Sequence, residues 1–195
     1  MRTGRLEAFS DAVVAILITI MVLELKIPRG ASLHALRPLL PICLTYLLSF
    51  VYLGIYWNNH HHMLQVTEHV NGTILWANLH LLFWLSLVPF TTGWMGENGF
   101  ATLPTAAYGT VLLLSAIAYF ILQSAIIAEQ GPRSKLRVAV GKDWKGKASP
   151  VIYLAAIGLT FAERWIGLGL YVLVALIWLV PDRRMERVLA PSTEP

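Results

Sequence analysis

A carboxylate near the start of a membrane-length apolar segment is the feature that most constrains this chain. Residues 5–25 read RLEAFSDAVVAILITIMVLEL, in which Asp11 follows Ser10 and precedes an almost unbroken aliphatic run. An ionised side chain that enters a hydrocarbon layer is costly, so it is retained where it has partners or a function. The segment therefore needs polar partners from elsewhere in the fold, and Asp11 is a candidate functional residue.

Composition identifies the surrounding medium. The chain has 195 residues, of which 56% are hydrophobic and 13% charged, whereas an average soluble domain carries about 25% charged residues. The apolar residues occur in long blocks, which predicts an all-α integral membrane protein with the bilayer as its partner. The net charge of +4 is explained by loop charges that set topology, so we expect no nucleic-acid partner.

Hydropathy and helix-terminus signals divide the chain into segments. A polar stretch at residues 129–148 holds six of the fifteen basic residues, and Ser149–Pro150 is a predicted helix start. Pro89 is expected to kink the helix that contains it. The expected long helices before the polar stretch cover residues 6–25, 38–63, 73–94 and 104–128.

Residues 150–180 are too long for one ordinary span. A single helix of this length would measure about 46 Å, against a hydrocarbon core of about 30 Å, so a fold at Glu163–Arg164 is an alternative. Six spans would leave eleven Lys and Arg residues on the cytoplasmic side and four outside. The positive-inside rule therefore predicts six helices in one domain (residues 1–195), both termini cytoplasmic, and a short cytoplasmic tail at 181–195.

The first apolar segment has two helical faces. Ile16, Ile20 and Leu23 share a stripe with Thr19 beside it, and Asp11 lies on nearly the opposite side. Periodicity alone favours the simpler interpretation, in which the stripe contacts lipid or neighbouring helices. The carboxylate, by contrast, needs hydrogen-bond donors.

Two polar and aromatic clusters are candidate donors. They read YWNNHHH (residues 56–62) and LWANLH (residues 75–80), and lie at the cytoplasmic ends of two consecutive expected helices. Their His, Asn and Trp N–H groups can donate hydrogen bonds to Ser10 and Asp11. A solvated aromatic belt at the membrane interface is the alternative, preferred for His62 and His69.

Three ordered motifs resemble the endosomal and lysosomal potassium channel family (transmembrane protein 175) and its prokaryotic relatives. They are Arg5-x-x-x-Phe9-Ser10-Asp11, Tyr56-Trp57-x-x-His60-His61, and Leu75-Trp76-x-Asn78-Leu79 followed by Pro89-Phe90. All lie within residues 5–90, and the second half of the chain fits in hydropathy alone.

The resemblance implies a six-helix subunit of a homotetramer whose first helix lines a central pore. It implies leak-like potassium permeation in a prokaryotic plasma membrane, without the Thr-Val-Gly-Tyr-Gly filter, and that string is absent here. It assigns Ile16 to the main constriction, Ile20 and Leu23 to further rings, and Thr19 to a hydroxyl layer tied to selectivity. It also implies a polar network that links the signature to the next two helices, namely Arg5, Phe9, Ser10 and Asp11 with His60 or His61, Trp76 and Asn78.

Other functions have weaker support. A secondary transporter would want an inverted repeat and polar residues at midmembrane, and the sequence has few such residues and no visible repeat. A haem or metal protein is suggested by six histidines, but His60, His61 and His62 point to different sides of a helix; only His60 and His80 could pair. We expect a channel rather than an enzyme, with no cofactor and with potassium as the permeant ion.

Overall fold

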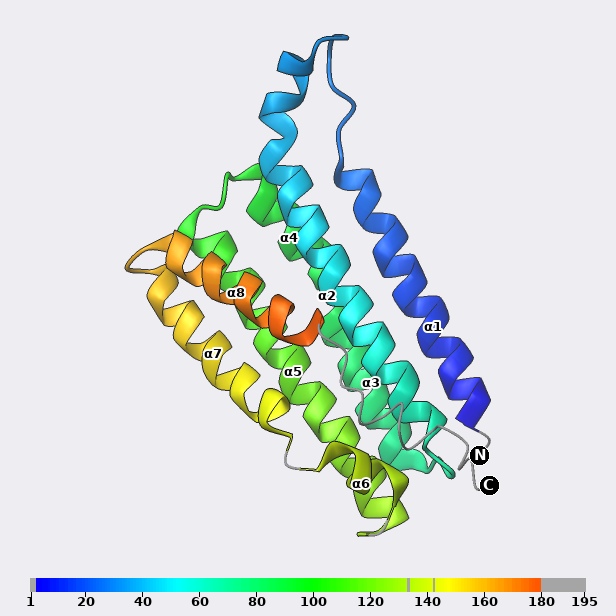
Figure 1. Cartoon of the computed structure of the whole chain (residues 1–195). Coiled ribbons are helices and arrows are strands. Elements are labelled where there is room, and N and C mark those ends of the chain that lie inside the picture. Colours follow the sequence, from blue (N-terminus) through cyan, green and yellow to red (C-terminus); the bar gives the residue numbers. More distant parts are fainter. Residues whose placement is uncertain (1–2, 133, 142, 180–195) are drawn as a thin grey trace, which may run out of the picture.

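The computed structural model describes residues 3–132, 134–141 and 143–179, and every regular element in these ranges is a helix (Figure 1). The all-α prediction is thus confirmed for the described chain. The tail predicted at residues 181–195 lies outside the described residues.

The first apolar segment forms α1 (Thr3–Ile20) and then tightens into the 3-10 helix η1 (Met21–Glu24). A second 3-10 helix, η2 (Leu33–Leu39), leads into α2 (Leu40–Gln65). The α-helical register of the first segment therefore ends earlier than the sequence predicted, because its last turn is 3-10.

The third expected helix is split at Leu87 into α3 (Gly72–Ser86) and α4 (Val88–Glu97). Pro89 causes the break, because it has no N–H to donate to the preceding turn and its ring crowds that turn. The predicted kink at this proline is confirmed. The start of α3 is fixed by Asn71, whose side chain accepts a hydrogen bond from the Ile74 N–H at 2.9 Å.

The fourth expected helix is α5 (Thr102–Gln130), which ends at Gly131 with φ +83°. The polar stretch after it contains a short helix, α6 (Lys135–Val140), and the first turn of α7 (Trp144–Thr160). The helix start predicted at Ser149–Pro150 is wrong: Asp143 caps the helix six residues earlier by accepting from the Gly146 N–H at 3.1 Å.

The apolar run of residues 150–180 is interrupted where a fold was expected. α7 ends at Thr160, and α8 (Arg164–Leu179) begins after a short turn. The two helices pack side by side (Figure 1). The described part of this run therefore forms two helices rather than one long one.

The bundle is built around α5, which packs against α3 and α7, while α2 packs against α4 and α8. Tyr52, Tyr108, Tyr153 and Tyr171 meet at the centre, with ring centroids 6.0–6.4 Å apart. α1 lies along one flank of the bundle, beside α2 and α3 (Figure 1). One side of the first helix is thus exposed in the part of the subunit that the structure describes.

In the described ranges, four segments are long and apolar enough to cross a membrane: Thr3–Glu24, Leu33–Gln65, Gly72–Glu97 and Thr102–Gln130. α8 is a shorter apolar helix. Large aliphatic side chains on many helices are exposed, as expected of surfaces that face lipid or neighbouring subunits rather than water. The chain is an integral membrane protein.

Candidate functional site

The buried face of α1 carries Leu6, Ser10, Val14 and Leu17, one residue per turn. This spacing keeps a single stripe directed at α2 and α3. The one polar member, Ser10, needs hydrogen-bond partners because it is shielded from solvent.

A chain of buried side chains supplies those partners. Ser10 Oγ donates to the Leu6 carbonyl at 2.9 Å and accepts from Asn78 Nδ2 at 3.0 Å. Asn78 Oδ1 lies 2.7 Å from His60 Nε2, and since the amide oxygen can only accept, the imidazole donates from Nε2. The Ser10–Asn78–His60 chain joins α1, α3 and α2 through three side chains that are all buried.

Asp11 lies at the edge of the buried Ser10–Asn78–His60 chain and is not part of it. Its Oδ1 accepts a hydrogen bond from Trp57 Nε1 at 3.0 Å. The Trp57 ring stacks on His61, one turn along α2, with centroids 5.8 Å apart and planes 20° apart. A half-buried carboxylate therefore has a donor from the neighbouring helix, which reduces its desolvation cost.

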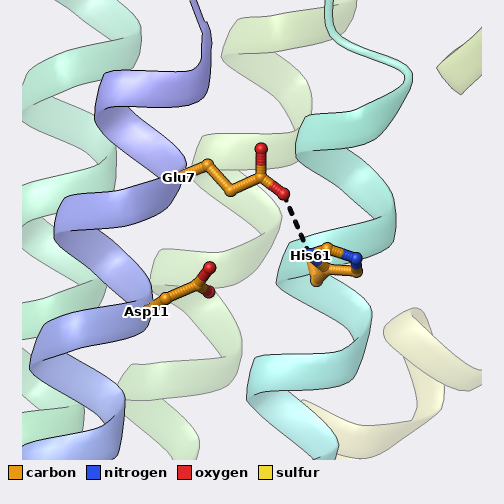
Figure 2. A group of neighbouring side chains, drawn as sticks. All are labelled: Glu7, Asp11 and His61. Atoms are coloured by element: carbon orange, nitrogen blue, oxygen red, sulfur yellow. Dashed lines mark ion pairs between the residues drawn. The ribbon is translucent and has the colours of Figure 1, made fainter.

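Glu7 and His61 form a second contact between the same two helices. His61 Nδ1 lies 2.9 Å from Glu7 Oε1, and His61 Nε2 lies 2.8 Å from Gln65 Nε2. Figure 2 shows the Glu7 and Asp11 carboxylates directed from α1 toward α2, with the His61 ring facing them. Two acidic residues one turn apart thus point into one gap.

Three residues that the resemblance placed in the polar network stand apart from it. Trp76 is 75% exposed, and Arg5 and Phe9 are also exposed. Among the described residues none of the three contacts the Ser10 or Asp11 side chain through a hydrogen bond or ion pair. Within one subunit, Trp57 takes the place expected of Trp76, because it lies on the face of α2 that meets Asp11.

The structure distinguishes the two candidate histidines. His60 belongs to the buried chain with Asn78, and His61 faces Glu7. His80, the alternative partner of His60, is exposed and accepts from Trp84 Nε1 at 2.9 Å. The described residues therefore bring no pair of axial haem ligands together from His60 and His80.

The outward face of α1 carries the predicted stripe. Ile16 is 58% exposed and Leu23 is 77% exposed, and Ile20 and Thr19 also lie on the surface of the subunit. Thr19 Oγ1 donates to the backbone carbonyl of Ala15 or Ile16, at 2.9 and 3.0 Å. Its hydroxyl proton is thus occupied by the helix, and the remaining lone pair of its oxygen can face outward.

Sequence reasoning missed Glu7, which contacts His61. The available signal was an acidic residue four positions before Asp11, a spacing that places both on one face of a helix. Trp57 was part of a quoted motif but was not assigned to Asp11. Its pairing depends on the rotation of α2 relative to α1, which no local pattern specifies.

The far end of the first segment also carries charge. Lys26, which follows η1, pairs with Glu97, the last residue of α4, and this carboxylate raises the pKa of the Lys26 ammonium above its ordinary value. Glu24 lies beside Gly93 of α4. This end of α1 is therefore lined by acidic groups with one paired lysine.

Comparisons with known proteins agree on one relationship. The family described as "Endosomal/lysosomal potassium channel TMEM175" matches residues 5–89. A protein named as a potassium channel from Chryseobacterium sp. (strain P1-3) is 56% identical over 189 residues, which cover 97% of this chain and 98% of that relative.

A solved structure matches as well. The crystal structure of a lysosomal potassium-selective channel TMEM175 homolog from Chamaesiphon minutus aligns with a TM-score of 0.82 and 29% identity, covering 92% of this chain and 97% of that one. A zebrafish (Danio rerio) protein named as an endosomal/lysosomal proton channel TMEM175 is 27% identical over 132 residues, 65% of this chain but 24% of that protein. The chain shares motifs with the family model, aligns over nearly its full length with a bacterial relative at 56% identity, and has the fold of a solved homolog. This chain therefore belongs to the TMEM175 family.

Proposed function

We propose that the chain forms a potassium-permeable, leak-like cation channel, assembled as a homotetramer around α1. The observation that carries the proposal is the division of α1 into two faces. Ser10 is fixed to the subunit core through Asn78 and His60, while Ile16, Thr19 and Ile20 are exposed on the surface that the described residues form. The names of the bacterial relatives supply the permeant ion.

In this proposal Ile16 forms the tightest ring, and Ile20 and Leu23 form further rings toward the other end of α1. Four isoleucines around an axis can narrow a pore until water leaves it, and dewetting blocks ions. Aliphatic side chains offer no oxygen to replace hydration, so a passing ion keeps its water or loses it at a cost. Potassium holds its hydration shell less tightly than sodium, which gives a modest preference for potassium.

Thr19 would add the one polar layer on this stripe. Its hydroxyl proton is bonded to the α1 backbone, which favours an oxygen lone pair facing the axis. Four such oxygens would offset part of the dehydration cost of a cation. Selectivity would then come from helix side chains instead of backbone carbonyls, in keeping with the absence of a Thr-Val-Gly-Tyr-Gly string.

The proposed topology has six spans, with α3 and α4 counted as one broken span and α7 and α8 as separate short ones. The start of α1, the α2–α3 turn and α6 lie at one end of the molecule, and the connection between η1 and η2 lies at the other (Figure 1). Four basic residues in α6 and at the start of α7 favour the first end as cytoplasmic: Lys135, Arg137, Lys145 and Lys147. The membrane would be a prokaryotic plasma membrane, as suggested by the bacterial relatives.

Ion flux from proteoliposomes of the pure protein tests the proposal. We expect passive potassium flux that exceeds sodium flux and does not saturate at millimolar concentrations. A rate that saturates with the turnover of a carrier would support a secondary transporter instead. Proton flux should be recorded in parallel, because the zebrafish relative is named as a proton channel.

The assembly is tested separately by native mass measurement in mild detergent. We expect four chains, since one subunit has no internal repeat that could surround an axis. A monomer that nevertheless supports flux would contradict the pore-lining role of α1.

A further inference from the structure

Glu7, Asp11 and His61 converge on one gap between α1 and α2 (Figure 2). One ligating atom from each side chain lies within 4.8 Å of the other two. The two carboxylates come from successive turns of α1 and the imidazole comes from α2. All three side chains are half-buried, so the gap is shielded but can be reached from solvent.

The donor set indicates which ions would fit. Two carboxylates and one imidazole nitrogen suit zinc and neighbouring first-row transition metals. Calcium and magnesium prefer oxygen ligands alone. Tetrahedral zinc with bonds of about 2.1 Å places its ligand atoms about 3.4 Å apart. The ligand atoms of this cluster would therefore have to move closer together, and rotation of the flexible Glu7 side chain can supply that movement.

His61 Nδ1 gives an independent indication. This atom is closed off from solvent and makes no well-directed hydrogen bond to any described residue, although Glu7 Oε1 lies 2.9 Å away. This nitrogen is shielded, is poorly directed at Glu7 and lies near two carboxylates. A metal ion between the nitrogen and the carboxylates would give it a partner.

The surrounding side chains would support such an ion. Trp57 donates to Asp11 Oδ1, and the second carboxylate oxygen accepts no hydrogen bond from the described residues. Gln65 lies 2.8 Å from His61 Nε2, the nitrogen that faces away from Glu7. Its amide, turned to present oxygen, would accept from Nε2–H and leave Nδ1 as a ligand, the usual outer arrangement around a metal-bound histidine.

We propose that Glu7, Asp11 and His61 bind a divalent transition metal, with zinc as the best fit, and that the bound ion joins α1 to α2. With three protein ligands, water completes the coordination. A second consequence rests on the proposed channel function: an ion that fixes α1 against α2 holds the Ile16 stripe in place and reduces potassium flux.

Metal binding is tested without reference to transport. Zinc is titrated into chelator-treated protein in detergent by calorimetry, and cobalt serves as a spectroscopic probe of nitrogen and oxygen ligands. We expect one saturable zinc per chain, and at least about tenfold weaker binding in Glu7→Gln and in His61→Gln. Glu68→Gln and His69→Gln, which change the same residue types outside the cluster, serve as matched controls.

A third variant guards against loss of folding. Glu7→His replaces an oxygen donor by a nitrogen donor, so we expect it to retain cobalt and to shift the visible absorption of the bound ion. The proposal is overturned by absence of saturable binding to the unchanged protein, or by equal binding in Glu7→Gln and His61→Gln. Equal weakening in the Glu68 and His69 controls would also overturn it.

The flux consequence is measured last, with zinc added to potassium-loaded proteoliposomes. We expect zinc to slow potassium release from the unchanged protein but not from His61→Gln. Zinc binding without any potassium flux would contradict the channel function while leaving the metal site intact. Potassium flux without saturable zinc binding would contradict the metal site while leaving the channel function intact.

Discussion

Asn78 on α3 donates a hydrogen bond of 3.0 Å to Ser10 on α1, and both side chains are buried. The same amide accepts from His60 through its oxygen. One side chain thus connects the first helix to two others, which explains how α1 keeps a fixed rotation although its outer face is exposed among the described residues.

Replacement of Asn78 by leucine should destabilise the subunit. Asn78→Leu leaves the buried His60 N–H without its acceptor, a change that costs about 1–3 kcal/mol. Thermal unfolding in detergent should show a clear fall in melting temperature. Asn98→Ala is the control, because Asn98 is exposed and its side chain donates to the Trp94 carbonyl of the preceding helix. An equal fall in both variants would contradict a special role for the Ser10–Asn78–His60 chain.

Asp11 should act as a fastener of α1 and not as an ion ligand in the pore. Asp11→Ala removes the acceptor of the Trp57 N–H, so the yield of folded, assembled protein should fall together with the current. Size-exclusion chromatography and flux measure the two effects, with chelator present to exclude bound metal. Glu68→Ala changes an exposed carboxylate and should alter neither.

A change in ion preference without loss of assembly would contradict the fastener role of Asp11. If the Asp11→Ala protein is as abundant and as fully assembled as the unchanged protein, and only its ion preference differs, then Asp11 faces the permeation path.

Widening the proposed constriction should increase conduction. Ile16→Asn introduces a polar group into an apolar ring, which lowers the dehydration barrier for every cation. Potassium and sodium fluxes should both rise, and their ratio should approach one. Leu154→Asn makes a similar change at an exposed aliphatic position on α7 and should leave both fluxes unchanged. Unaltered flux in Ile16→Asn would place the constriction elsewhere.

Close packing of α8 against α7 depends on Gly167. A Cβ at this position would lie 2.9 Å from the Ala156 carbonyl oxygen and would overlap the Thr160 hydroxyl. Gly167→Ala should therefore lower stability by about 1–3 kcal/mol through overpacking. Thermal unfolding in detergent checks this value.

Gly169 provides a matched control in the same helix. Nothing lies within 4 Å of a Cβ built at this position, so Gly169→Ala should be neutral or stabilising by up to about 1 kcal/mol through helix propensity. Equal effects at the two glycines would show that the α7–α8 approach does not limit stability.

The membrane environment, the main helices and the polar residues of α1 that need partners could be predicted from the sequence. Long apolar blocks require a membrane whatever the packing, and Pro89 breaks its helix because the missing N–H is a property of the residue. Ser10 and Asp11 were singled out because polar groups in an apolar segment need partners. Asn78 belonged to one of two candidate donor clusters, and the family resemblance assigned it to the polar network.

Tertiary structure alone decided which side chains meet. Trp57 and not Trp76 reaches Asp11, His60 and not His61 reaches Asn78, and Glu7 faces His61. Each pairing depends on the rotation of one helix about its axis relative to another, where a turn of about 100° exchanges one neighbour for the next. That rotation is set by packing across the whole bundle, so no pattern within a single helix contains it.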